Sequence, residues 1–371
     1  MRHALISLCL LAFAACGGGG TSATPLAPAS AGDPWGAATA AIQAAQPQFP
    51  AGLCVEVATP AGVVYSRSFG GFTNQDSVLV ASGSKWVSST VILRLVNAGA
   101  FAHGLDTQAK ELLVDANGKP WTGNMGDITL RQLLSFTSGI SGDDAASDNL
   151  FITLDEAVRQ IYADFAATAS RPGSYFYYGS THLRIAARMA EVATGKSWSQ
   201  LFAEQLHDPM GWAGTSIYSN NGPNPNPAGG LKCTGLEYMR FLMMQLRNGM
   251  DGTHLFLPSP LIVAQRTDGY GPATTLAYSP FQEAAGWTYH YALGNWLETS
   301  DGTGTGTVVR YSSTGTFGWG PWVAADGKYG AIIMTKQAQG LILPTEQLKA
   351  QLDPLIRTAL AQNPPVIRAV P

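Results

Sequence analysis

The sequence predicts an α+β fold in which one antiparallel sheet is built from both ends of the chain. Three observations lead to this prediction: strand-like alternation is confined to the two ends, helical periodicity dominates the middle, and each end carries a helix. The simplest assembly places the terminal helices against the sheet. The sheet then comes from residues of about 33–81 and 287–362, and a large all-helical insertion occupies about 82–286.

The first end of the chain combines a helix with a hairpin. Asp33 and Pro34 are residue types typical of an N-cap and a first helical position, and they predict a helix that runs to about Gln46. Residues 53–58 alternate and are rich in β-branched side chains. A Gly-containing turn separates them from residues 63–70, so the two runs predict antiparallel strands.

The middle of the chain predicts helices joined by loops. One helix begins near Trp86 and is stopped by Gly99, a residue type that commonly follows a helix end. Asp127 is a candidate N-cap for a short helix at 129–134. The Asn- and Pro-rich residues 220–227 predict a loop. Further helices are predicted at 154–165, 183–193, 198–206 and 236–246.

The last part of the chain returns to strand-like patterns. Residues 344–361 form an amphipathic pattern that predicts a closing helix. The turns between the strands contain Gly-Thr and Asp-Gly pairs, which are typical of tight connections. The strands themselves are predicted at 288–297, 307–312, 320–325 and 329–336.

Composition and charge describe a globular protein with a sizeable core. Of the 371 residues, 46% are hydrophobic and only 13% are charged. The formal net charge is −3, and no basic block occurs, so nucleic-acid binding has no electrostatic support. Residues 33–362 are predicted to form a single domain.

The first residues predict export and attachment to a membrane. Arg2 followed by apolar residues 4–14 is typical of an export signal. Phe13-Ala14-Ala15-Cys16 resembles a bacterial lipobox, with Phe13 where leucine is usual, and this resemblance implies lipidation at Cys16. Residues 1–16 are then a lipoprotein signal peptide and 17–32 a flexible tether to a membrane that faces the periplasm. The alternative is an ordinary cleaved signal peptide and a free, secreted product.

Two cysteines remain after Cys9 in the predicted signal and the lipidation candidate Cys16. Cys54 and Cys233 would lie in an oxidising compartment, where a single disulfide between them is possible. They can equally be two small buried apolar residues. Their spacing matches no metal site.

The stretch that carries chemistry is Ser82-Gly83-Ser84-Lys85, just before the helix near Trp86. A serine and a lysine three residues apart at a helix start share one face, so the hydroxyl can contact the amine. A lysine desolvated there can lose its proton and act as a base, and the helix N-terminus favours developing negative charge. The alternative is a serine N-cap followed by a solvated lysine.

Three further stretches follow this motif in order, at 129–139, 172–180 and 313–318. Together the four stretches resemble the serine β-lactamase and penicillin-binding-protein superfamily. The resemblance is strongest to class C β-lactamases, serine D-alanyl-D-alanine peptidases and family VIII esterases. It covers about residues 35–360 and implies a β-lactamase/transpeptidase-like fold.

The resemblance implies a role for each matching residue. Ser82 is implied to be the acylated nucleophile and Lys85 its amine partner. Tyr178 matches a tyrosine that passes the proton between nucleophile and leaving group. Near neutral pH this requires a cation that favours the phenolate, and Lys85 is the candidate; a core aromatic is the alternative. Ser180 stands where the family usually has asparagine, and it can bond the lysine or a substrate oxygen, or be a turn residue.

The stretch Ser313-Thr314-Gly315 stands where the family has Lys-Thr-Gly or His-x-Gly on the strand beside the site. Ser313 replaces the cation that helps to hold a substrate carboxylate in β-lactamases and peptidases. Arg310 lies at odd spacing on the same predicted strand, so it should point to the opposite face. By the family pattern, Gly315 lets the acyl group approach the strand, and the backbone N–H groups of Ser82 and Thr316 form the oxyanion hole.

Other catalytic arrangements have less support in the sequence. No Gly-x-Ser-x-Gly elbow occurs, and no two of the six histidines form a His-x-x-x-His pair, so no zinc site is predicted. His182, four residues after Tyr178, is interpreted as a helix-surface or supporting residue. Phe317 and Trp319 are candidates for an apolar acyl or alcohol pocket.

We therefore expect an exported serine hydrolase that acts through an acyl-serine intermediate, with no metal or organic cofactor. Carboxylesterase-like activity on a small ester or amide is preferred because the cation for an acidic substrate is missing. β-Lactamase or D-alanyl-D-alanine carboxypeptidase activity, with a lactam or peptide substrate, is the alternative. A non-catalytic penicillin-binding or penicillin-sensing lipoprotein is an alternative of a different kind. The oligomeric state, and whether loops at 140–150 and 220–227 cover the site, stay open.

Overall fold

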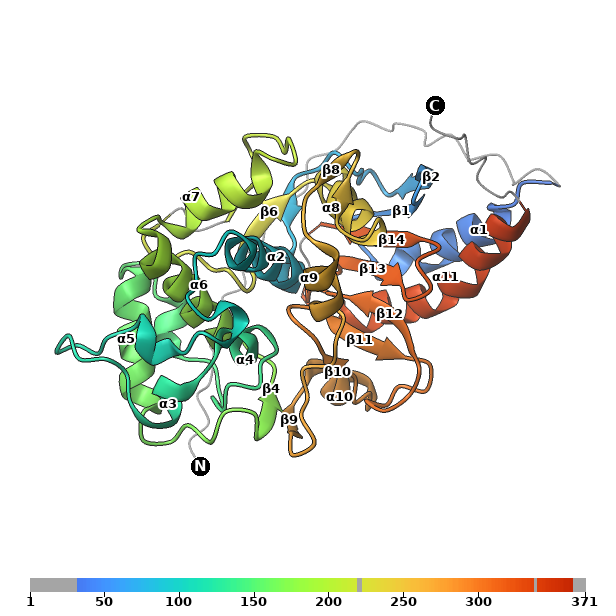
Figure 1. Ribbon diagram of the computed structural model, residues 1–371. Coiled ribbons are helices and arrows are strands. Elements are labelled where there is room, and N and C mark those ends of the chain that lie inside the picture. The colour runs from blue at the N-terminus through green and yellow to red at the C-terminus, as the bar shows by residue number, and fades with distance from the viewer. Residues whose placement is uncertain (1–31, 219–221, 337–338, 363–371) are drawn as a thin grey trace, which may run out of the picture.

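The computed structural model describes residues 32–218, 222–336 and 339–362 (Figure 1). The predicted signal peptide, the lipidation candidate Cys16 and the tether up to residue 31 lie outside these residues. Within the described ranges, no helix is both long and apolar enough to cross a membrane.

Seven strands form one antiparallel sheet that draws on both ends of the chain, as predicted. Leu53 at the start of β1 pairs with Phe69 of β2 on one side and with Thr335 of β14 on the other. Because β1 lies inside the sheet with both faces covered, all seven of its residues are buried. The spatial order is β10 (His290–Tyr291), β11 (Trp296–Thr299), β12 (Val308–Ser312), β13 (Gly320–Ala324), β14 (Gly330–Thr335), β1 (Leu53–Thr59) and β2 (Gly62–Phe69).

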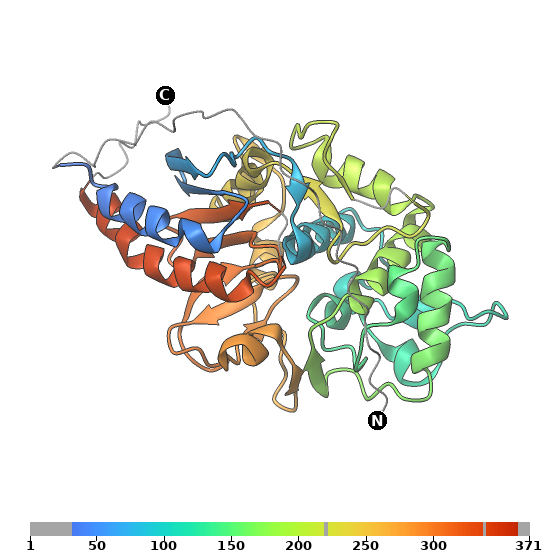
Figure 2. The ribbon, with the colours of Figure 1, turned by 180° about the vertical axis from the view of Figure 1, so that it is seen from behind.

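The terminal helices α1 (Gly36–Ala45) and α11 (Ile342–Gln362) lie side by side across one face of this sheet (Figure 2). Ile42 of α1 and Leu352 of α11 join Val55 and Ile333 of the sheet in one apolar cluster. Burial of this cluster holds the two chain ends together. The predicted fold class is therefore confirmed.

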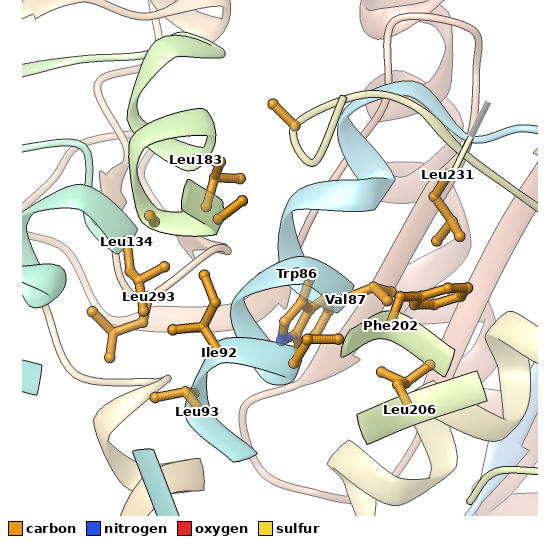
Figure 3. Packing of buried hydrophobic residues seen from close by; sticks show 14 of the residues in the cluster. Trp86, Val87, Ile92, Leu93, Leu134, Leu183, Phe202, Leu206, Leu231 and Leu293 are labelled. Carbon is orange, nitrogen blue, oxygen red and sulfur yellow. The ribbon is translucent and has the colours of Figure 1, made fainter. Parts of the chain in front are cut away.

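The opposite face of the sheet is covered by α8 (Gly235–Leu246), and α2 (Ser84–Asn97) runs through the middle of the molecule (Figure 1). Only Arg94, Val96 and Asn97 of α2 are not buried. Figure 3 shows side chains of α2 extending to several sides into the surrounding apolar residues. A helix packed on all sides is a rigid support for residues at its N-terminus.

The inserted region contains the predicted helices but also short strands, so it is not all-helical. Tyr175–Tyr177 (β4) pairs in parallel with Thr275–Tyr278 (β9), a contact between segments about a hundred residues apart that no local pattern predicts. The other short strands of the inserted region are β5 (Ile217–Tyr218), β6 (Leu231–Cys233), β7 (Met250–Asp251) and β8 (His254–Leu255), and β3 (Val78–Leu79), just before the region, pairs with β6. The remaining α-helices are α3 (Gly123–Asp127), α4 (Leu130–Leu134), α5 (Leu154–Phe165), α6 (Thr181–Thr194), α7 (Trp198–Phe202), α9 (Ser259–Ala264) and α10 (Pro280–Ala285).

Two predicted helix N-caps are wrong. Asp33 accepts a hydrogen bond from the Trp35 N–H at 2.9 Å, but this closes a turn before α1, whose N-cap is Trp35. Asp127 ends α3, and the N-cap of α4 is Thr129. Thr129 and Gln132 form a capping box in which each side chain bonds the backbone of the other, satisfying two terminal donors at once.

The run predicted as one strand at 288–297 is two strands, β10 and β11. The Ala292 N–H donates to the Asn295 carbonyl at 2.8 Å, and Gly294 has a φ of +88°. A conformation of this kind requires glycine and turns the chain sharply. Residues before and after this turn are buried, so the strand-like pattern of the sequence shows no break at the turn.

Cys54 and Cys233 are both free and buried, so the disulfide alternative is wrong and the interpretation as small apolar residues holds. Burial raises the pKa of the Cys54 thiol to about 11 and that of Cys233 well above its ordinary value. Thiols of this kind are unreactive toward oxidants and alkylating reagents.

Candidate active site

Ser82 lies in a short turn, Ala81–Gly83, between β3 and the start of α2. Ala81 has a φ of +47°, an unfavourable conformation for a residue with a side chain. Such strain persists only where the surroundings hold it, and it is common at functional sites. The Ser82 side chain is half-buried and faces a pocket, so its hydroxyl is within reach of a ligand.

Hydrogen bonds from distant segments hold this turn. The Ser84 hydroxyl donates to the Ala81 carbonyl at 2.6 Å and accepts from the Leu231 N–H at 3.0 Å. The Tyr238 hydroxyl donates to the Gly83 carbonyl at 2.7 Å. Because β6, α8 and the turn are fixed to one another, the position of the Ser82 oxygen is set before any ligand binds.

Lys85 lies one helical turn after Ser82 and is only 3% exposed. Its Nζ is 3.0 Å from the Ser82 Oγ and 2.9 Å from the Ala228 carbonyl oxygen. Burial lowers the pKa of Lys85 to about 8, and the negative charge of Asp143 opposes this shift. The amine is therefore close to the balance between its charged and neutral forms near neutral pH, as a general base requires.

Tyr178 follows β4 and meets the other two residues, as predicted. Its ring stacks on Trp296 with centroids 4.9 Å apart, and the Lys85 Nζ lies 4.7 Å from the ring centroid. Burial raises the pKa of the Tyr178 phenol, and hydrogen bonds with Ser82 and Trp296 oppose this only in part. The expected phenolate is therefore not favoured, because desolvation of the phenol is the largest effect. Tyr178 is instead a protonated phenol beside Ser82, and Lys85 is the better base.

His182 is buried and holds the backbone at Tyr177, the residue before Tyr178. One ring nitrogen, Nε2, lies 2.9 Å from the Tyr177 carbonyl, and the other, Nδ1, lies 2.9 Å from the Ser138 hydroxyl. Burial lowers the pKa of His182 to about 4, so the ring is neutral. Of the two interpretations made from the sequence, the helix-surface one is wrong and the supporting one holds.

Asp143 is a residue of the pocket that sequence reasoning missed. Its Oδ1 accepts hydrogen bonds from the N–H groups of Ser180, at 2.5 Å, and Thr181, at 3.1 Å. These are free donors at the N-terminus of α6, where a negative charge is favoured. Through Asp143, the loop near 140–150 contributes to the wall of the pocket. Ser180 also lines it, although its hydroxyl makes no hydrogen bond to Lys85.

The two faces of the strand that leads to Ser313 have different surroundings. Ser313 is buried, and its hydroxyl donates to the Ser82 carbonyl at 2.9 Å. Arg310 points to the other face, as its spacing predicted, where its Nε lies 2.7 Å from Glu298 Oε2. Ser313 therefore supports the nucleophile turn and does not line the pocket, whereas Thr314 and Thr316 do. Ser313, which stands at a substrate-binding position of the family pattern, is therefore not one of the residues that line the pocket.

A buried ionic cluster lies behind Thr314. The Lys349 Nζ is 2.6 Å from Glu298 Oε1, 2.6 Å from Glu346 Oε1 and 3.1 Å from the Thr314 hydroxyl. Burial raises the pKa of Glu298, but the charges of Lys349 and Arg310 outweigh it and hold the pKa at about 2. Lys349 and Arg310 are therefore paired with buried carboxylates behind the strand and do not face the pocket.

Gly315 lies against the nucleophile turn. A Cβ at this position would be 2.3 Å from the Val80 carbonyl oxygen and 3.2 Å from the Ser82 nitrogen. No side chain fits there, so glycine brings the strand next to the Ser82 N–H. The expected oxyanion hole between the Ser82 and Thr316 N–H groups is compatible with this approach.

Gly315→Ala is expected to displace the strand and to slow acylation of Ser82 by about 100-fold or more, since an error of about 1 Å is enough for such a loss. The crowding is also expected to destabilise the fold by about 1–3 kcal/mol. The rate of labelling by a fluorophosphonate probe measures the first effect and urea unfolding the second. Gly214→Ala is the matched control, because a Cβ at Gly214 meets nothing within 4 Å. Equal behaviour of the two variants would contradict the prediction.

The pocket has a volume of about 250 Å³, and Ser82, Lys85 and Tyr178 all line it. Phe317 and Trp319 were the candidates for its apolar wall, but neither residue lines the pocket. Trp319 is fully buried against Tyr238. The residues that line the pocket are Ser82, Lys85, Asp143, Tyr178, Gly179, Ser180, Tyr278, Pro280, Phe281, Trp296, Thr314, Thr316 and Ile342.

The arrangement can carry out nucleophilic acyl transfer. A serine hydroxyl contacts an amine with a lowered pKa, a phenol lies beside both, and backbone N–H groups adjoin the serine. Among the described residues, no group of three or more His, Cys, Asp or Glu side chains is placed to hold a metal ion.

Comparisons with known proteins agree with this geometry. A family model described as Beta-lactamase matches residues 42–350. Penicillin-binding protein 4 of Amycolatopsis lactamdurans is 26% identical over 272 residues, which cover 63% of this chain and 67% of the relative. A crystal structure from Bacteroides dorei, provisionally named a β-lactamase, has a TM-score of 0.74 and 28% identity and covers 87% of this chain and 99% of its own. A mutant of simvastatin synthase from Aspergillus terreus shares the fold, with a TM-score of 0.66 at 18% identity, and covers 89% of this chain and 100% of its own.

Proposed function

Because the chain belongs to the serine β-lactamase and penicillin-binding-protein family, we propose that it is a serine hydrolase with carboxylesterase-like activity on a small ester or amide. The observation that carries the preference for such substrates is the position of Ser313. This position holds a cation for acidic substrates in the family pattern, but here it is a buried hydroxyl bonded to the Ser82 carbonyl. Of the described residues that line the pocket, Lys85 is the only one with a cationic side chain.

The proposed reaction uses the groups in the order of their contacts. Lys85 takes the proton of the Ser82 hydroxyl as the oxygen attacks the substrate carbonyl. The N–H groups of Ser82 and Thr316 stabilise the oxyanion. The proton returns to the leaving oxygen or nitrogen through the Tyr178 hydroxyl, which leaves an acyl-serine. Water, activated by the same amine, releases the acid and restores the serine.

Three reagents test the proposal on the purified full-length protein: p-nitrophenyl butyrate, the β-lactam nitrocefin and a fluorophosphonate probe. We expect ester hydrolysis and labelling of Ser82, with a much lower turnover of nitrocefin. Absence of both hydrolysis and labelling would favour the non-catalytic alternative. Nitrocefin turnover equal to ester turnover would favour the β-lactamase alternative.

The pH dependence of ester hydrolysis is expected to follow Lys85. Only the neutral amine accepts the serine proton, so kcat/KM should rise about tenfold per pH unit up to about pH 8 and level off above it. Asp143→Asn removes a negative charge that raises the pKa of Lys85, and the rising limb should move to lower pH. Initial rates, corrected for spontaneous hydrolysis, measure both profiles. A limb that moves to higher pH in the variant would contradict this assignment.

We propose further that the protein is exported and lipid-anchored through Cys16. The support is the apolar run 4–14 followed by the lipobox-like Phe13 to Cys16 sequence. In a bacterial host, Cys16→Ser is expected to release the protein from the membrane fraction and to abolish incorporation of labelled palmitate. Cys54→Ser, at a buried thiol, is the control for loss of a cysteine as such. Palmitate incorporation that persists in Cys16→Ser would show that another residue is modified.

A further inference from the structure

We infer that Asp143 selects substrates that carry an ammonium group, so that this site acts on cationic esters and amides. This inference rests on the proposed function and names its substrate class. It starts from a charge in the pocket that acyl transfer does not need.

Hydrogen bonds hold one oxygen of the Asp143 carboxylate, and the other oxygen accepts none from the described residues. Oδ1 accepts from the Ser180 N–H, the Thr181 N–H and the Thr181 hydroxyl, at 2.5, 3.1 and 3.3 Å. None of the described residues donates a hydrogen bond to Oδ2 or pairs with Asp143 in a salt bridge. The residue itself is exposed and lines the pocket that contains Ser82. One carboxylate oxygen is therefore fixed by the end of α6, and the other is available to a ligand.

The carboxylate lies close to the reacting groups. Gly179 stands between Tyr178 and Ser180, and a Cβ there would be only 2.6 Å from Asp143 Oδ1. The charge of Asp143 acts on Lys85 as well as on Tyr178. A ligand group that pairs with Asp143 can therefore belong to the same small molecule whose carbonyl is attacked by Ser82.

Within residues 32–218, 222–336 and 339–362, no cationic side chain forms a salt bridge with this carboxylate, although its charge acts on Lys85 and Arg184. Lys85 is bound to Ser82 and Ala228, and Lys349 and Arg310 are paired with buried glutamates behind the strand. Arg184 is buried and bonded to Asn224 and Pro225. Among the described residues, the pocket therefore contains a carboxylate without a salt-bridge partner at Asp143, while the position that carries a cation in the family pattern is the buried Ser313.

Aromatic rings complete the surroundings of Asp143. Tyr177 and Tyr278 pack with ring centroids 5.2 Å apart. Burial raises the pKa of both phenols, and the charge of Asp143 adds a smaller contribution to each shift. Tyr278 lines the pocket. Aromatic faces attract ammonium groups and have no such attraction for carboxylates. A carboxylate beside tyrosine rings is thus suited to an amine or a quaternary ammonium group and repels an acidic substrate.

Three p-nitrophenyl esters of similar length test the inference. The ester of 4-(trimethylammonio)butyrate is cationic at every pH, the ester of 5,5-dimethylhexanoate is its neutral isostere, and the mono-ester of glutarate is anionic. We expect kcat/KM for the cationic ester to exceed that for the isostere by about tenfold or more, and the glutarate ester to be the poorest substrate. A preference for the neutral or anionic ester would overturn the inference.

Asp143→Asn keeps an oxygen to accept from the α6 N–H groups and removes only the charge. We expect the cationic-to-neutral ratio of kcat/KM to fall about tenfold, mainly through KM for the cationic ester. Asp148→Asn, an exposed residue of the same loop that does not line the pocket, is the matched control and should keep the ratio. If both esters lose activity equally in Asp143→Asn, the carboxylate only positions α6 and the inference is wrong.

A binding measurement separates this inference from the proposed function. The unreactive 4-(trimethylammonio)butanamide is titrated calorimetrically into Ser82→Ala and into Ser82→Ala/Asp143→Asn. Binding that requires Asp143 supports the inference even if no ester is hydrolysed. Equal binding, or none to either protein, overturns it even if the neutral ester is a good substrate.

Discussion

Replacing Ser82 by alanine is expected to reduce kcat/KM for p-nitrophenyl butyrate by about 10⁴-fold or more and to abolish fluorophosphonate labelling. The change removes the only atom that can form the acyl-enzyme in the proposed reaction. The turn itself should stay intact, because it is held by the Ser84, Tyr238 and Ser313 hydroxyls and not by the Ser82 side chain. Lys85 keeps its contact with the Ala228 carbonyl.

Ser199→Ala, on the exposed surface of α7, is the matched control for loss of a serine hydroxyl. Both variants should unfold at the same urea concentration as the parent protein. If Ser82→Ala is folded but still hydrolyses the ester at the parental rate, the nucleophile is another residue. If it is labelled at a different serine, mass spectrometry of the labelled peptide identifies that residue.

Lys349→Met is expected to cause a large loss of stability, about 3–5 kcal/mol in the free energy of unfolding. Methionine fills nearly the same space but leaves the carboxylates of Glu298 and Glu346 buried without their shared cation. Burial raises the pKa of Glu346, which means that its charged carboxylate is unfavourable there even with the lysine present. The loss should reach the active site as well, because the Thr314 hydroxyl bonds both Lys349 and Glu346.

Lys328→Met is the control, since the Lys328 side chain is 74% exposed and its closest approach to Asp326 is 3.9 Å. We expect less than about 0.5 kcal/mol for this variant. The double variant Lys349→Met/Glu346→Leu should recover part of the stability, because it also removes an unpaired buried carboxylate. Urea unfolding monitored by tryptophan fluorescence measures all three. A loss for Lys349→Met no larger than that for Lys328→Met would show that the cluster contributes little.

The central parts of the fold and site could be predicted because their signals are local. Ser82 and Lys85 are one helical turn apart, so their contact follows from helix geometry alone. Alternation near both chain ends predicted the sheet. The place of Tyr178 in the site followed from the order of the four motif stretches along the chain. In each of these predictions, the residue types and their spacing carry the information.

The parts that were missed depend on contacts between distant segments. The Ala228 carbonyl that holds Lys85 has no side-chain signature, and Asp143 reaches α6 from a loop about forty residues earlier. The tyrosine prediction failed in its electrostatics, because burial, which no local pattern shows, raises the pKa of Tyr178. The apolar wall was assigned to the wrong aromatics, since burial against α8 removes Trp319 from the pocket.

The antiparallel pairing of β1 with β14 also orders the events of folding. Leu53 and Thr335 are neighbours in the sheet but lie at opposite ends of the described chain. The hairpin of β1 and β2 can form early, but its inner edge stays unpaired until β14 has been synthesised, and closing such a long loop is slow. During that interval the exposed edge is open to pairing with other chains. We therefore expect chaperones to be needed at this stage, and chains truncated before β14 to aggregate rather than to fold partially.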